Sequence, residues 1–101
     1  MLSLEEVKNE LDKTYDDPLT DRKLTAIMRR AESKVRKYVG IDDSTEFNAE
    51  EDELFINYCR YADNNALDMF EVNFQREINE ARAVRMVEAM ASAEEGGESG
   101  T

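Results

Sequence analysis

Residues 48–81 read NAEEDELFINYCRYADNNALDMFEVNFQREINEA, and this stretch, which contains neither glycine nor proline, decides the fold class. Asn48 and Glu51 have the spacing of a capping box, which satisfies free backbone N–H groups at a helix N-terminus. We therefore expect a helix to begin at Ala49 and to continue, as one long helix or as two abutting helices, to residue 91. The two-helix alternative places a break at residues 63–65, because aspartate and asparagine are poor helix formers.

The apolar residues of this stretch form two adjacent stripes at helical spacing. One wide arc contains Leu54, Phe55, Tyr58, Cys59, Tyr61, Ala62, Ala66, Met69, Phe70 and Val72. A second stripe beside it contains Ile56, Leu67, Phe74 and Ile78. Two stripes are more apolar surface than one flanking face can hide. The stretch is interpreted either as the centre of a compact bundle or as a helix that also contacts another copy of the chain, and the second stripe favours the interface.

Two further helices are predicted before this stretch. Ser3 and Glu6 also have the spacing of a capping box, so we expect a short helix over residues 4–13. Asp17 followed by Pro18 predicts the start of a second helix. Aspartate caps helices well, and proline lacks the N–H group that would be unsatisfied at the first helical position.

The complete pattern predicts an all-α fold. The second helix is expected over residues 19–39, because Gly40 is the residue type found just past a helix C-terminus. We therefore predict a small helical bundle with a short N-terminal helix, an amphipathic second helix and a long C-terminal helix. One domain should cover residues 1–91, followed by a flexible acidic tail over residues 92–101.

Charge is strongly polarised along the chain. Residues 18–39 contain seven basic and two acidic residues, a net charge of +5, whereas the whole chain carries a net charge of -11. On a helical wheel the seven cations lie opposite the apolar arc: Arg22, Lys23, Arg29, Arg30, Lys34, Arg36 and Lys37. This basic side is either a nucleic-acid patch or a partner for acidic residues of the same chain or of a neighbouring copy. The negative net charge favours the second interpretation.

Composition excludes several classes of function. The 101 residues include 24 acidic and 13 basic residues, one cysteine and no histidine. Without histidine the chain can build no His-based catalytic triad and no imidazole metal ligand. The single cysteine can close no internal disulfide, and without nitrogen ligands it builds no zinc site. We therefore expect no catalytic residue, no cofactor and no metal site.

Three other features have ordinary structural interpretations. The acidic run Glu50–Glu53 is interpreted as a helix start, because carboxylates favour the positive end of a helix and consecutive helical residues point in different directions. Cys59 lies in the apolar arc and is expected to act as a small hydrophobic residue. No apolar run approaches the roughly 18 residues that span a bilayer, so we expect no membrane partner.

Two stretches resemble the head-tail connector proteins of tailed phages. Residues 2–41, LSLEEVKNELDKTYDDPLTDRKLTAIMRRAESKVRKYVGI, resemble that family's N-terminal signature of a short LEEVK helix, a DD-containing turn and an amphipathic helix that ends in Tyr-x-Gly. Residues 53–82, ELFINYCRYADNNALDMFEVNFQREINEAR, are similar to the long helix of connectors from phages and prophages of Gram-positive bacteria. Pro18 stands where acidic or small residues are common in the family, and the segment after Arg85 matches no part of it.

The resemblance implies a non-enzymatic structural subunit without a cofactor. Identical copies would form a ring, dodecameric in the virion, that lies beneath the phage portal protein and extends the DNA channel. The partners would be other copies of the chain, the portal protein and a downstream tail-completion protein, with DNA present only in passage and no membrane. The expected location is the head-tail junction of the virion, with assembly in the host cytoplasm.

In such a ring, one face of each copy meets a different face of the next. The residues predicted to form this interface are Arg22, Arg29, Arg30, Arg36, Ile56, Leu67, Phe74 and Ile78. Two alternative functions are an acidic DNA mimic, suggested by an isoelectric point near 4.4, and a small scaffolding or regulatory module that binds a partner helix. The basic side of residues 19–39 counts against a DNA mimic, which should present unbroken negative charge.

Overall fold

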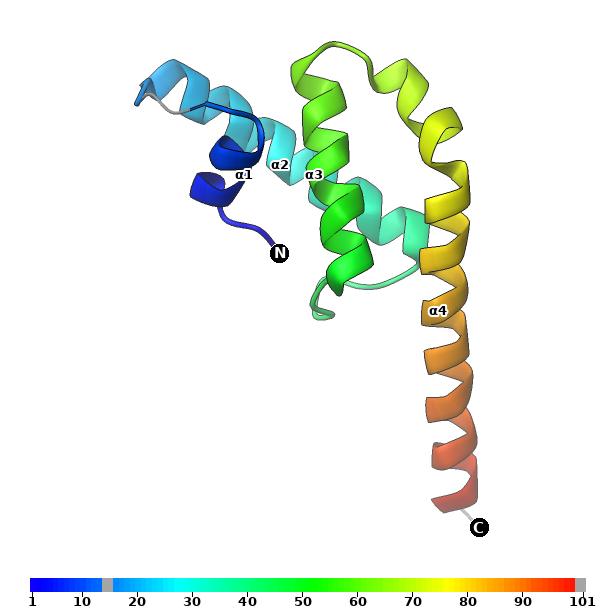
Figure 1. The fold of residues 1–101 in the computed structure, drawn as a ribbon. Helices are drawn as coiled ribbons and strands as arrows, with labels where there is room; N and C mark the ends of the chain where they lie inside the picture. The colour runs from blue at the N-terminus through cyan, green and yellow to red at the C-terminus, as the bar shows by residue number, and fades with distance from the viewer. Residues whose placement is uncertain (14–15, 100–101) are drawn as a thin grey trace.

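A computed structural model describes residues 1–13 and 16–99 and shows an all-α fold, as predicted (Figure 1). Across these residues there is no β-strand. The elements, in chain order, are α1 (Leu4–Glu10), α2 (Pro18–Val39), α3 (Ala49–Asp63), the short 3-10 helix η1 (Leu67–Met69) and α4 (Phe70–Ser99).

The predicted caps begin the first two helices. The Ser3 hydroxyl accepts a hydrogen bond from the Glu6 N–H at 3.2 Å, and the Glu6 carboxylate accepts one from the Ser3 N–H at 3.1 Å. The Asp17 carboxylate accepts from the Leu19 N–H at 3.1 Å, so α2 begins at Pro18, one residue before the predicted start. α1 ends at Glu10, three residues before the predicted end, because the backbone turns into the left-handed region at φ 58° for Asp12.

Left-handed residues also explain where α2 and α3 end. Gly40 has a φ of 75°, a conformation that glycine adopts without strain, and it caps α2. Asn65 has a φ of 56°, and asparagine tolerates this region better than most residues. α3 therefore ends at Asp63, and the two-helix alternative for residues 49–91 is correct.

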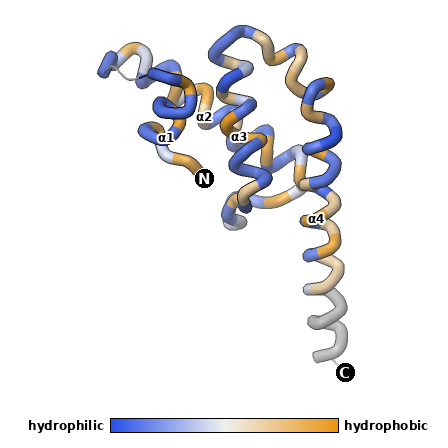
Figure 2. The backbone as a smooth tube through the Cα atoms, viewed as in Figure 1, coloured by the Kyte–Doolittle hydropathy of each residue, from blue (hydrophilic) through white to orange (hydrophobic). Residues whose placement is uncertain are grey.

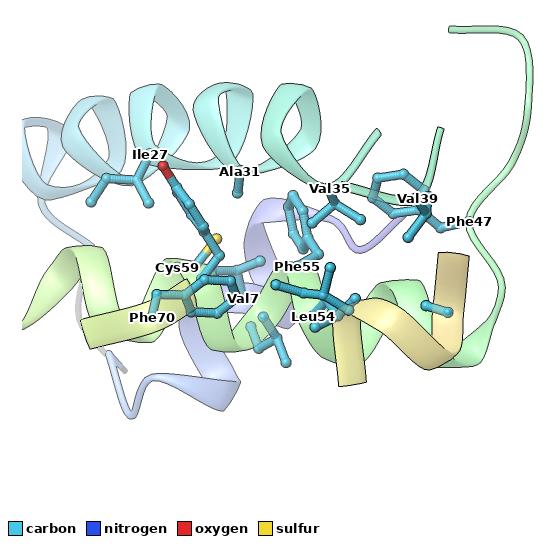
Figure 3. Close-up of a cluster of buried hydrophobic side chains, with 14 of the residues drawn as sticks. Val7, Ile27, Ala31, Val35, Val39, Phe47, Leu54, Phe55, Cys59 and Phe70 are labelled. Carbon is cyan, nitrogen blue, oxygen red and sulfur yellow. The ribbon is translucent and has the colours of Figure 1, made fainter. Parts of the chain in front are cut away.

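The core lies between α2 and the pair formed by α3 and α4 (Figure 3). α2 contributes one buried stripe at helical spacing, consisting of Leu24, Ile27, Ala31, Val35 and Val39. Phe70, at the start of α4, is completely buried. Its ring contacts the rings of Tyr58 and Tyr61 edge-on, at centroid distances of 5.2 and 5.6 Å, and stacks on Phe74 at 4.9 Å. Phe70 therefore joins α3 to α4.

The structure corrects the expectation that the second apolar stripe needs another copy to cover it. Ile56 is 5 % exposed and Ile78 is 6 % exposed within the single chain, and Leu67 and Phe74 are partly buried against the core. The reason is the break at Asp63, which lets α4 return alongside α3 instead of continuing away from it. Ile56 and Ile78 are core residues and offer no surface to a second copy.

α4 extends well beyond the other helices, which makes the molecule 58 Å long (Figure 1). Apolar residues continue along this projecting half, where Val84, Met86, Val87 and Met90 are exposed (Figure 2). α4 runs to Ser99, whereas the sequence predicts a flexible tail from residue 92. Alanine and glutamate in this segment favour a helix, whereas the adjacent Gly96 and Gly97 each cost about 1 kcal/mol. Residues 100–101 of the predicted tail lie outside the described residues.

Phe70→Ala should destabilise the fold strongly. Removing a fully buried phenylalanine leaves a cavity, so the free energy of unfolding should fall by about 3–5 kcal/mol in denaturant titrations. The control is Val72→Ala on the same helix, where the side chain is 71 % exposed and the change should stay within about 0.5 kcal/mol. Equal losses in the two variants would contradict the placement of Phe70 at the centre of the core.

Candidate functional site

The outward side of α2 carries six exposed basic side chains, which we call the basic face: Arg22, Lys23, Arg29, Arg30, Lys34 and Lys37. They include three of the predicted interface residues. None of the six lies within 4.0 Å of a carboxylate in the part of the chain whose side chains are described. Their positive charge is therefore directed to solvent. Of the two predicted partners, acidic residues of the same chain and those of a neighbouring copy, the first is not found among the described side chains.

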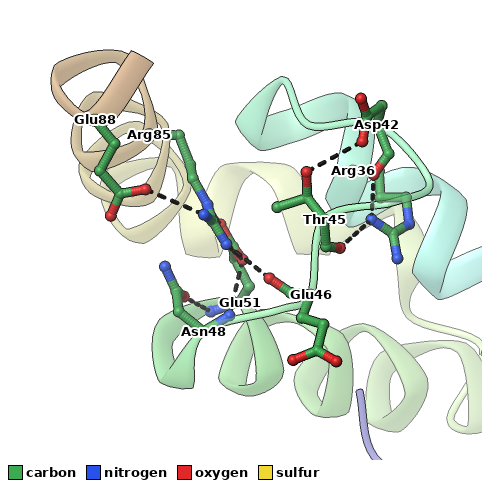
Figure 4. A network of polar contacts seen from close by, with 8 residues as sticks. All are labelled: Arg36, Asp42, Thr45, Glu46, Asn48, Glu51, Arg85 and Glu88. Atoms are coloured by element: carbon green, nitrogen blue, oxygen red, sulfur yellow. Dashed lines mark hydrogen bonds and ion pairs between the residues drawn. The ribbon is translucent and has the colours of Figure 1, made fainter. Parts of the chain in front are cut away.

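Arg36, the seventh predicted cation, has a different role. Its guanidinium donates hydrogen bonds to the backbone carbonyls of Asp42 and Thr45, the latter at 2.8 Å (Figure 4). It donates another to the Glu32 carboxylate at 3.2 Å. It also lies 4.9 Å from the centre of the Phe47 ring. Arg36 therefore holds the loop between α2 and α3 in place, and it is not free for the predicted interface.

An acidic groove of about 490 Å³ lies between α3 and α4. Its apolar lining consists of Leu54, Phe74, Ala81 and Val84. Four exposed carboxylates border it, Glu50 and Glu53 from α3 and Glu77 and Glu80 from α4. Of the predicted interface residues in the second stripe, Phe74 lines this groove. Leu67, in η1, packs against the core instead. The groove could not be predicted from the sequence, because its residues come from two helices whose alignment depends on the break at Asp63.

The basic face and the acidic groove lie on different sides of the molecule. α2 forms one layer, and α3 and α4 form the other (Figure 3). No residue of α2 lines the groove. On α4, Glu71 and Arg82 point to α2, where they bond to the hydroxyl and the carbonyl oxygen of Tyr38 at 2.9 and 2.7 Å.

The groove residues of α4 point elsewhere. At about 100° per residue, Glu77, Glu80 and Val84 lie on a different side of that helix from Glu71 and Arg82. The groove therefore opens away from α2, and the cations of the basic face cannot reach its carboxylates within one copy.

A buried ion pair fixes α4 against the start of α3 (Figure 4). Arg85 donates two hydrogen bonds to the Glu51 carboxylate, from Nε and Nη2, each at 2.7 Å. Nη2 also donates to the Glu46 carbonyl at 2.8 Å, and Nη1 donates to Glu88 at 3.1 Å. Glu51 is fully buried and also accepts the Asn48 N–H at 3.0 Å, so the predicted capping residue has a second role.

The electrostatics of this pair follow from its geometry. Burial raises the pKa of Glu51, but the hydrogen bonds from Arg85 and from the Asn48 amide outweigh burial and hold the pKa of Glu51 below its usual value. The bonds to Glu51 raise the pKa of the Arg85 guanidinium, a group that is charged in proteins in any case. No sequence pattern marks Arg85, since its partner lies 34 positions earlier in the chain.

The single cysteine is a buried packing residue. Cys59 is buried, and burial raises the pKa of its thiol to about 12, which keeps it protonated. Within the described residues, no three histidine, cysteine, aspartate or glutamate side chains are grouped as metal ligands. None of the described helices is both long and apolar enough to cross a membrane.

Comparison with known proteins gives no match to a family model, to a curated protein or to a solved structure.

Arg85→Met should destabilise the protein by about 3–5 kcal/mol, because it leaves the buried Glu51 carboxylate without its counter-charge. The matched control is Arg76→Met on the same helix. The Arg76–Glu80 pair is 3.3 Å long but its side chains are 86 % and 67 % exposed, so the control should change the free energy of unfolding by less than about 1 kcal/mol. Chemical denaturation at pH 7 measures both.

The pH dependence of unfolding separates loss of charge pairing from loss of packing. In the parent protein the ionised Glu51 makes its full contribution to stability at any pH above its ordinary pKa of 4.5. This contribution disappears as the pH falls through the lower pKa that Glu51 has in the folded state. In Arg85→Met the Asn48 N–H still lowers the pKa of Glu51, but the Arg85 bonds no longer oppose the effect of burial, so the variant's stability deficit should shrink as acid protonates Glu51. A deficit that does not change between pH 7 and pH 4 would contradict this account of Arg85.

Proposed function

We propose that this chain is a structural subunit that joins identical copies head-to-tail into a ring, as the head-tail connector of a tailed phage. The observation that carries this proposal is the placement of a basic face and an acidic groove on different sides of one small helical subunit. Head-to-tail association needs two different, complementary surfaces on each copy, and it closes into a ring when the rotation between copies permits. The resemblance of residues 2–41 and 53–82 to connector proteins supports the same proposal.

Such a ring would lie beneath the portal protein and contact a tail-completion protein on its other side. DNA would pass through its channel, and the distribution of charge is suited to this task. Exposed cations that reach phosphates add binding affinity and would retard the passage of DNA. A ring that covers the basic face within its subunit contacts removes six cations from the channel wall and leaves the channel mainly acidic or neutral.

The two alternative functions fit the surface less well. A DNA mimic should present continuous negative charge, and the six solvent-directed cations of α2 interrupt it. A module that binds a partner helix would use the groove but would leave the basic face without a role. Oligomeric state separates the proposals, since both alternatives predict a monomer or a two-fold dimer.

Sedimentation velocity and native mass spectrometry of the full chain should detect a closed oligomer of one stoichiometry, visible as rings by electron microscopy. Because opposite charges hold the copies together, assembly should weaken as salt rises from 0.05 to about 0.5 M, where the Debye length is only several ångströms. A chain that stays monomeric or dimeric at every concentration, with or without a portal protein, would contradict the proposed function.

A further inference from the structure

We infer that the acidic groove between α3 and α4 receives the basic face of α2 from a second copy of this chain. The inference rests on the proposed function and specifies its contact surfaces. It concerns two features of opposite charge that form no ion pair with each other within the described residues. These are the four carboxylates that border the groove, of which Glu80 pairs with the exposed Arg76, and the six solvent-directed cations of α2.

The basic face has the shape that a groove with an apolar lining requires. Ala26 and Ser33 are exposed along its middle, and both are small enough to let the helix approach closely. At about 100° per residue, Arg22 and Arg29 lie on one flank of this ridge, and Lys23, Arg30 and Lys34 lie on the other. The basic face is therefore a ridge that carries two small side chains, with cations on both flanks and with Lys37 on the ridge itself, one turn after Ser33.

The groove is the complement of that ridge. Its apolar lining includes the partly buried Phe74 and the exposed Val84, which a small-residue ridge can cover without burying a charge. Each wall carries a pair of glutamates three residues apart, Glu50 and Glu53 on α3 and Glu77 and Glu80 on α4. A helix seated between the walls places cations from both flanks opposite carboxylates, and opposite charges in register favour both rapid association and a single orientation.

A second copy is the occupant that the charges favour. The groove requires a basic helix, and α2 presents one with matching flanks. Because the groove opens away from α2, each copy can satisfy its groove only with the α2 of another copy. The same geometry leaves the donor copy's own groove free, so the contact propagates head-to-tail.

A charge-swap experiment tests this pairing. The groove variant carries Glu53→Lys and Glu77→Lys, one change on each wall, and the ridge variant carries Arg29→Glu and Arg30→Glu. These four side chains are exposed and form no ion pair within the described residues, so both variants should fold, as circular dichroism can verify. Each variant alone should self-associate at least about tenfold more weakly than the parent, because like charges then face each other. An equimolar mixture should recover association, with the two variants alternating.

The control for the groove variant carries Glu46→Lys and Asp68→Lys, which raise the net charge by the same amount as the groove variant does, at exposed positions outside the groove. It should associate like the parent. If the groove and ridge variants also associate like the parent, or if their mixture fails to recover, the inference is overturned while self-association stands. A parent protein that never self-associates would overturn the proposed function as well.

Discussion

Burial of the apolar stripe of α2 against α3 and α4 is the constraint on which the rest of the structure depends. Leu24, Ile27 and Val35 can reach the core only when the opposite side of α2 faces solvent, and that side carries six cations. The same packing occupies the α2-facing sides of α3 and α4, so the glutamates of these helices border a groove elsewhere. The packing of α2 against α3 and α4 therefore separates a positive surface from a negative one in a chain with a net charge of -11.

Charged residues divide into two groups with different roles. Arg36, Glu51 and Arg85 are satisfied inside the subunit, where they tie the loop before α3 and the middle of α4 to the core. Breaking such a pair is costly because the remaining charge is buried. The cations of the basic face and the carboxylates of the acidic groove remain in water, where each isolated charge contributes little to folding. These surface charges are therefore available for recognition between copies.

Local signals in the sequence predict the elements well and the tertiary contacts poorly. Ser3, Asp17 and Asn48 mark helix starts because a cap needs only neighbouring residues, and Gly40 marks a helix end for the same reason. The burial of Ile78 and the pairing of Arg85 with Glu51 depend on the position that α4 takes alongside α3 after the turn at Asn65. No local sequence pattern encodes that position. The prediction that the second stripe forms an interface is wrong for Ile56 and Ile78. The outward placement of the predicted cations is confirmed apart from Arg36, and a role of the basic face in an interface stays a prediction. Its proposed partner surface could not be predicted, since the groove exists only after α3 and α4 pack side by side.

Zero-length carbodiimide cross-linking of the assembled protein tests the central claim most directly, because it joins only amines and carboxylates that touch. An equal mixture of unlabelled and nitrogen-15-labelled chains identifies cross-links between copies by mass spectrometry. The account predicts mixed-isotope cross-links from Lys23, Lys34 or Lys37 to Glu50, Glu53, Glu77 or Glu80, and their loss at high salt. Mixed-isotope cross-links that consistently join these lysines to carboxylates outside the groove, or an assembly in which these lysines form none, would contradict it.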